Sequence, residues 1–169
     1  MYISKGVAVW LIVSSIIVIL DAFFILSRPL AFPGGPYYWF YFPYELYYQH
    51  DSLYGPKVDD HFVVIIAWLN LLEVALTFLG LAVYSKECSR AKIKGAMICL
   101  VASVFIFWKT VIYMWYDVAY LSEEALNFSP DSLLLYYLPN SLWILFPIWS
   151  IGSIGGRLGK QIFKAKGKQ

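Results

Sequence analysis

Residues 61–84 read HFVVIIAWLNLLEVALTFLGLAVY, an apolar run that contains one acidic residue, Glu73, and no Lys or Arg. A transmembrane helix needs roughly 20 apolar residues to cross about 30 Å of hydrocarbon. Helix is required there because an unpaired peptide group in lipid costs several kcal/mol. This stretch therefore predicts a membrane-spanning helix.

Three further runs of the same kind lie on either side of it, at residues 7–26, 95–115 and 133–154. The chain of 169 residues is 60% hydrophobic and only 14% charged, too few polar residues to cover a soluble domain of this size. The sequence predicts an all-α membrane protein, a four-transmembrane-helix bundle that forms one domain over residues 1–169. Residues 157–169 are expected to form a basic cytosolic tail.

The charges between the runs alternate in sign. Basic residues prevail at the amino end, at residues 86–94 and in the tail, whereas acidic residues prevail at 27–60 and 116–132. Because Lys and Arg keep short loops in the cytosol, both termini are predicted to be cytosolic. The first run is expected to be a retained helix, since no small-x-small cleavage site follows it.

The first connection is unusually aromatic. Residues 33–55 read PGGPYYWFYFPYELYYQHDSLYG. One interpretation is an aromatic belt at the membrane surface. The other is a lid folded over the helix ends, and the acids Glu45 and Asp51 are not explained by a belt alone. Both interpretations stay open.

The fourth run contains two prolines, Pro139 and Pro147. A proline has no backbone N–H and is expected to interrupt the helix. A membrane bundle tolerates such breaks when neighbours satisfy the freed carbonyls.

Three ionisable residues fall inside the apolar runs: Asp21, Glu73 and Lys109. Such residues cost about 2.5–3.5 kcal/mol at the membrane centre, so each requires a partner or a function. From the helical rise, Asp21, Lys109 and Asn140 lie roughly 8–10 Å below the non-cytosolic surface, and Glu73 lies roughly 18 Å below it. Three helices therefore bring polar groups to one level.

Helical spacing places these groups on defined faces. Lys109, Tyr113 and Asp117 recur at i, i+4 and i+8, and Trp143 follows Asn140 on one face of the fourth helix. We expect these faces to surround one cavity.

Two acids and one base within the membrane leave the charge unbalanced, and three explanations stay open. One acid is protonated, as desolvation favours. Alternatively, the cavity binds a cationic group. In the third, Lys109 and Asp21 form a buried pair that only fixes the helix register.

Several short motifs occur in a characteristic order. Asn140-Ser141-Leu142-Trp143 precedes Pro147, residues 44–54 read YELYYQHDSLY, an acid (Asp21) lies on the first helix, and Val111-Ile112-Tyr113 leads to Asp117. In order and spacing the chain resembles the EXPERA family, which includes sterol Δ8-Δ7 isomerases and the sigma-2 receptor. The resemblance covers residue 21 to about residue 158.

The resemblance implies an endoplasmic-reticulum protein whose cavity binds a sterol or an amphiphilic amine. It also implies a homodimer. The bilayer is the other expected partner, and the sequence predicts no nucleic-acid partner, no metal and no cofactor. The candidate ligand-binding residues are Asp21, Asp51, Glu73, Lys109, Tyr113, Asp117, Asn140 and Trp143.

Two departures from the isomerase pattern argue against strong catalysis. Ile17 stands where the isomerase carries a His, and Ala67 stands where it carries a Glu. A proton shuttle needs such groups. We therefore expect a binding protein; a divergent sterol isomerase and a membrane scaffold with purely structural charges remain the alternatives.

Overall fold

The structure is a computed structural model that describes residues 1–56, 61–120 and 129–166. Lys57, Asp59, Asp60, Glu123, Glu124 and Lys168, which entered the charge pattern, lie outside these ranges. The described residues form helices and no strand. In chain order the elements are α1 (Lys5–Leu26), α2 (Arg28–Ala31), α3 (Tyr38–Tyr41), α4 (Tyr44–Tyr48), η1 (Ser52–Tyr54), α5 (His61–Tyr84), α6 (Ser89–Tyr120), α7 (Pro130–Ser132), η2 (Leu133–Tyr137) and α8 (Leu138–Lys166).

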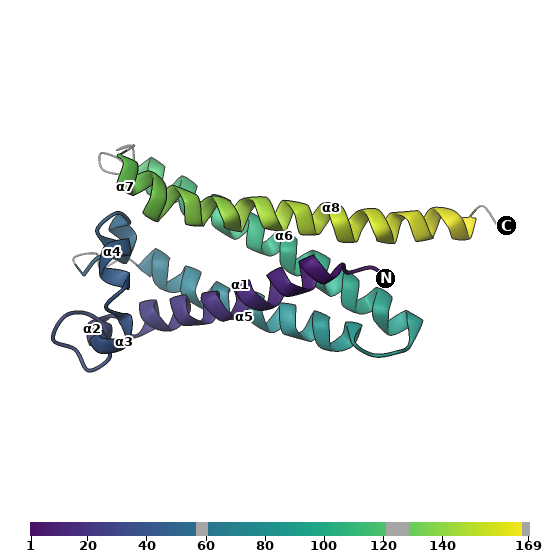
Figure 1. Ribbon diagram of the computed structural model, residues 1–169, viewed down its shortest axis with the longest axis horizontal. Coiled ribbons are helices and arrows are strands. Elements are labelled where there is room, and N and C mark those ends of the chain that lie inside the picture. The colour runs from purple at the N-terminus through teal and green to yellow at the C-terminus, as the bar shows by residue number, and fades with distance from the viewer. Residues whose placement is uncertain (57–60, 121–128, 167–169) are drawn as a thin grey trace.

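The four long helices lie along the long axis of the molecule (Figure 1). α5 packs against both α1 and α6, and α6 packs against α8, whereas α1 and α8 meet only sparsely. The amino terminus, the α5–α6 connection and the carboxyl end lie at one end of the bundle, and α2, α3 and α4 lie at the other (Figure 1). The helices thus form a row, α1–α5–α6–α8, that scarcely closes between its first and last members.

Each of the four long helices is long and apolar enough to cross a membrane. The spans are Lys5–Leu26, His61–Tyr84, Ser89–Ala119 and Pro130–Lys164. Large apolar side chains such as Trp68, Val101 and Leu145 point outward and are more than half exposed in the isolated chain. Such a surface is suited to lipid. The predicted all-α fold with four candidate transmembrane helices is confirmed.

The fourth helix differs from expectation, because α8 runs through Pro147 without a break. The irregularity lies earlier, in η2, a π-helical turn in which the N–H of Leu138 bonds to the carbonyl of Leu133. Pro139 follows this turn. The expected interruption at Pro147 is therefore wrong: loss of one N–H donor is not enough to end a helix that neighbouring helices support. α8 also continues to Lys166, so residues 157–166 of the expected tail are helical.

The antiparallel pair of α5 and α6 packs closely because of two glycines. A Cβ atom on Gly95 would lie 2.4 Å from the backbone nitrogen of Tyr84, and one on Gly80 would lie 2.6 Å from the sulfur of Cys99. Small residues at such points let two helix backbones approach. This close contact holds α5 and α6 in a fixed register for the polar side chains they carry.

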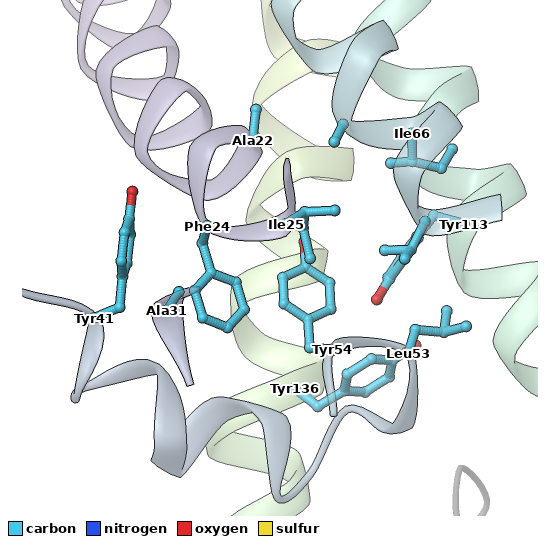
Figure 2. Packing of buried hydrophobic residues seen from close by; sticks show 12 residues of the cluster. Ala22, Phe24, Ile25, Ala31, Tyr41, Leu53, Tyr54, Ile66, Tyr113 and Tyr136 are labelled. Carbon is cyan, nitrogen blue, oxygen red and sulfur yellow. The ribbon is translucent and has the colours of Figure 1, made fainter. Parts of the chain in front are cut away.

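The first connection packs onto the helix ends through an aromatic cluster. Figure 2 shows Phe24 of α1, Tyr54 of η1 and Tyr136 of η2 gathered with Tyr113 of α6. Arg28, itself buried, donates from Nη1 to the carbonyl of Leu53 at 2.8 Å and so ties α2 to η1. The first connection is therefore part of the packed structure.

Candidate functional site

A cavity of about 340 Å³ lies among all four long helices and the first connection. The helices contribute Ile17, Val18, Asp21, Ile66, Asn70, Lys109, Thr110, Tyr113, Pro139, Asn140 and Trp143, and the first connection contributes Pro43, Tyr44, Tyr47 and Tyr54. It includes residues of both α1 and α8, the two helices that meet only sparsely.

The carboxylate of Asp21 is the acidic group that lines this cavity. Tyr54 donates its hydroxyl hydrogen to Oδ2 at 2.8 Å, and Asn70 donates from Nδ2 to the same oxygen at 3.2 Å. Within the described part of the chain, the one ion pair found joins Lys109 to Glu73 and does not include Asp21. Asp21 is thus held by neutral donors and forms no ion pair there.

Lys109 lines the cavity, but its ammonium belongs to another acid. Its Nζ lies 2.8 Å from Oε2 of Glu73, and both side chains are less than a tenth exposed. Lys109 also donates to Oδ1 of Asn70. The third explanation of the unbalanced charge, a Lys109–Asp21 ion pair, is therefore wrong.

Side-chain direction explains this difference. Helical side chains lean toward the amino end of their own helix. α5 and α6 run in opposite directions, so Glu73 and Lys109 lean toward each other along the membrane normal. α1 runs parallel to α6, so the side chains of Asp21 and Lys109 lean in the same direction. Their lean therefore does not bring the two charged groups closer together. The depth estimate took account of backbone rise alone.

α8 supplies Asn140 and Trp143. The amide of Asn140 donates from Nδ2 to the carbonyl of Tyr136 at 2.9 Å and also hydrogen-bonds the hydroxyl of Tyr47. The ring of Trp143 lies edge-on to that of Trp10, with centroids 5.4 Å apart. Both cavity residues of α8 are therefore fixed by their neighbours.

Asp51 lies behind the cavity wall. It is fully buried in the first connection and accepts hydrogen bonds from the hydroxyl of Tyr113 at 2.6 Å and the N–H of Leu53 at 3.1 Å. Burial raises the pKa of Asp51 to about 7, opposed by the Tyr113 hydrogen bond and reinforced by the negative charge of Asp117. Tyr47 donates to Asp51 as well, so two cavity-lining tyrosines are anchored by one acid.

Five of the eight candidate residues line the cavity, and three lie behind it. The five are Asp21, Lys109, Tyr113, Asn140 and Trp143. Glu73 pairs with Lys109, Asp51 holds Tyr113, and Asp117 is buried and places its negative charge near Asp51. Glu73 and Asp51 therefore act on the cavity through side chains that line it.

Sequence reasoning did not single out the aromatic wall. Tyr44, Tyr47 and Tyr54 line the cavity together with Tyr113 and Trp143. The ring of Tyr54 lies edge-on to Tyr47 and Tyr113, with centroids 4.9 and 6.3 Å apart. The aromatic composition of the first connection was the signal in the sequence for these residues. The lid interpretation placed that connection over the helix ends but did not assign individual tyrosines to the cavity. Asn70 was recognisable on the same helical face as Glu73.

The two positions that departed from the isomerase pattern are apolar in space as well as in sequence. Ile17 lines the cavity, and Ala67 is buried in α5. Neither can carry a proton. Among the described residues, no group of His, Cys, Asp and Glu side chains is arranged to bind a metal ion.

Comparison with protein-family models finds no match to this chain. Comparison with curated proteins and with solved structures likewise finds none. The resemblance to the EXPERA family therefore remains a prediction based on its motifs, and the functional argument depends on the cavity.

Proposed function

We propose that this chain binds an amphiphilic ligand with a cationic amine group in the cavity among its four helices. One observation carries the proposal: the carboxylate of Asp21 lines the cavity, while the ammonium of Lys109 is paired with Glu73. A carboxylate that lines a membrane cavity and forms no ion pair favours a ligand that supplies a positive charge.

The aromatic wall supports the same ligand class. Rings of Tyr44, Tyr47, Tyr54, Tyr113 and Trp143 line the cavity that Asp21 faces. Ammonium groups are attracted to aromatic faces, by about 2 kcal/mol or more where water is excluded. A charged carboxylate and several rings around one space form a typical environment for a substituted amine.

The rest of the cavity suits an apolar ligand body. Its volume of about 340 Å³ lies within the range of small-molecule sites, about 300–1,000 Å³. Ile17, Val18 and Ile66 supply apolar walls. A sterol is the alternative ligand, because a hydroxyl group can hydrogen-bond to Asp21 and to the neighbouring amides.

The proposal includes an EXPERA-like arrangement in the endoplasmic-reticulum membrane, with both termini cytosolic and the first connection acting as a lid. Pro43, Tyr44, Tyr47 and Tyr54 of that connection line the cavity, which supports the lid. Both termini lie at the same end of the bundle, which supports the topology. The homodimer implied by the resemblance stays a prediction.

We expect binding without sterol isomerisation. Ile17 and Ala67 leave two positions of the isomerase's proton shuttle apolar. Expression in cells that lack a sterol Δ8-Δ7 isomerase should leave the Δ8 sterol unconverted. Full conversion would contradict the binder proposal and favour a divergent isomerase.

The direct test compares two ligands on the purified protein in lipid nanodiscs. N,N-dimethyldodecylamine, which is cationic near neutral pH, is the amine probe, and dodecanol is its neutral counterpart. Asp21→Asn should weaken amine binding by about 1.5–3 kcal/mol, roughly 10- to 150-fold, because a charge-assisted contact is lost. Dodecanol binding should change little.

Glu45→Gln is the matched control, since Glu45 accepts a hydrogen bond from Tyr38 in the first connection and does not line the cavity. It should leave both affinities unchanged. Equal amine binding by wild type and Asp21→Asn would overturn the proposal. Failure of the wild-type protein to bind either ligand, together with higher thermal stability of Asp21→Asn, would favour a scaffold with structural charges.

A further inference from the structure

Glu73 lies outside the cavity but pairs with Lys109, which lines it. We propose that Glu73 is a specificity-determining residue: by holding the ammonium of Lys109, it leaves the carboxylate of Asp21 to the ligand and makes the cavity select cationic over neutral amphiphiles. This inference rests on the proposed function.

Four side chains from three helices form a linear chain of contacts. Glu73 of α5 pairs with Lys109 of α6 at 2.8 Å, and Lys109 donates to Oδ1 of Asn70, again on α5. Asn70 then donates from Nδ2 to Asp21 of α1 at 3.2 Å. The order is therefore acid, base, amide, acid.

The amide of Asn70 has a defined orientation in this chain. Its carbonyl oxygen faces the ammonium and its N–H faces the carboxylate. An asparagine placed in this way separates the two charges with a neutral group, and each end satisfies one of them. It keeps Lys109 directed at Glu73.

These contacts determine the net charge of the cavity. With Glu73 present, Lys109 is balanced and Asp21 contributes a net negative charge to the cavity. Without the Glu73 charge, Asp21 is the remaining acid connected to Lys109 by this chain. Coulomb attraction is strong in a low-dielectric interior, so the ammonium would then neutralise Asp21 and compete with a cationic ligand.

The alternative role for the Glu73–Lys109 pair is purely structural. Buried ion pairs often fix helix register and add little else. The two roles differ in one measurable respect: a structural defect weakens binding of every ligand, whereas a change in cavity charge weakens binding of the cationic ligand alone.

The test measures the affinity ratio of N,N-dimethyldodecylamine to dodecanol on each variant in nanodiscs. Because both ligands are measured on the same sample, the ratio does not depend on the folded fraction. Glu73→Gln should lower amine affinity by about tenfold or more and dodecanol affinity by less than about threefold. Glu73→Asp, which keeps the charge, should retain most of the wild-type preference for the amine.

The double variant Glu73→Gln/Lys109→Met provides the rescue. It removes both charges of the pair and should restore the amine-to-alcohol ratio to within about threefold of wild type. An equal loss for both ligands in Glu73→Gln, or a double variant that does not recover the ratio, would assign the pair a structural role and overturn the inference.

The two proposals fail in different ways. If the wild-type protein does not prefer the amine, or Asp21→Asn keeps that preference, the proposed function is wrong and this inference is wrong with it. If wild type prefers the amine, Asp21→Asn loses the preference and Glu73→Gln keeps it, only the role of Glu73 is wrong.

Discussion

At the scale of single residues, Asp51 links ionisation to the stability of the first connection. It is fully buried, it anchors Tyr113 and Tyr47, and burial raises its pKa from 3.8 to about 7. An acid whose pKa rises on folding binds its proton more tightly in the folded state. Its contribution to stability is therefore present below about pH 4 and is lost as the pH rises from about 4 to about 7.

We expect the melting temperature of the wild-type protein to fall between about pH 4 and pH 7 relative to that of Asp51→Asn. One pKa unit corresponds to about 1.4 kcal/mol, so the relative loss amounts to a few kcal/mol. Thermal unfolding in detergent, followed by tryptophan fluorescence, measures the difference. Parallel curves for the two proteins across this range would show that Asp51 does not titrate on folding.

Residue positions in the cavity were partly predictable from the sequence. Helical faces and depths were sufficient to bring Asp21, Lys109, Asn140 and Trp143 to one space. The partner of Lys109 was not predictable in this way, since depth along the membrane normal ignores the lean of side chains on antiparallel helices. The role of these four cavity residues in ligand binding stays a prediction.

At the scale of elements, α5 and α6 depend on backbone contact at Gly95. A Cβ at this position would meet the backbone of Tyr84 at 2.4 Å, and backbone cannot rotate away as a side chain can. Gly95→Ala should therefore destabilise the protein by about 1–3 kcal/mol, despite the better helix propensity of alanine. The melting temperature in detergent should fall by several degrees.

Gly155→Ala on α8 is the matched control, because a Cβ there meets nothing within 4 Å. It should leave the melting temperature unchanged or raise it slightly, by up to about 1 kcal/mol in stability. Equal effects of the two substitutions would mean that the close approach of α5 and α6 does not contribute to stability.

Element boundaries were less predictable than element existence. Apolar runs located all four long helices, but α6 begins at Ser89 instead of Gly95 and α8 continues to Lys166. Hydropathy detects the part of a helix that fits the hydrocarbon. A helix continues beyond that layer wherever its residues have sufficient helix propensity. Charged residues such as Lys and Arg have it, so they do not end the helix.

At the scale of the whole molecule, the open row of helices accounts for the position of the cavity. α1 and α8 stand at the two ends of the row and meet only sparsely, so both can contribute to one space between them. Tyrosines of the first connection cover the same space. Four helices that closed fully on one another would fill this volume with side chains.

The same arrangement gives a sharp test of topology. Gln49 lies exposed in the first connection, and Cys88 lies exposed in the α5–α6 connection. These two connections lie at opposite ends of the bundle (Figure 1). Hydrogen bonds from the backbone N–H groups of Ala91 and Arg90 lower the pKa of the Cys88 thiol, which favours its reaction with maleimides. Cys99 is buried and should not react.

Cytosolic termini require Cys88 on the outer face of sealed microsomes and residue 49 in the lumen. A membrane-impermeant maleimide should therefore label the wild-type protein in intact vesicles. Gln49→Cys in a Cys88→Ser background should react only after the vesicles are permeabilised, and Cys88→Ser alone should stay unlabelled throughout. Labelling of residue 49 in intact vesicles, with Cys88 protected, would invert the topology. Labelling of both from the outside would mean that α5 does not cross the membrane, and the four-span arrangement would be wrong.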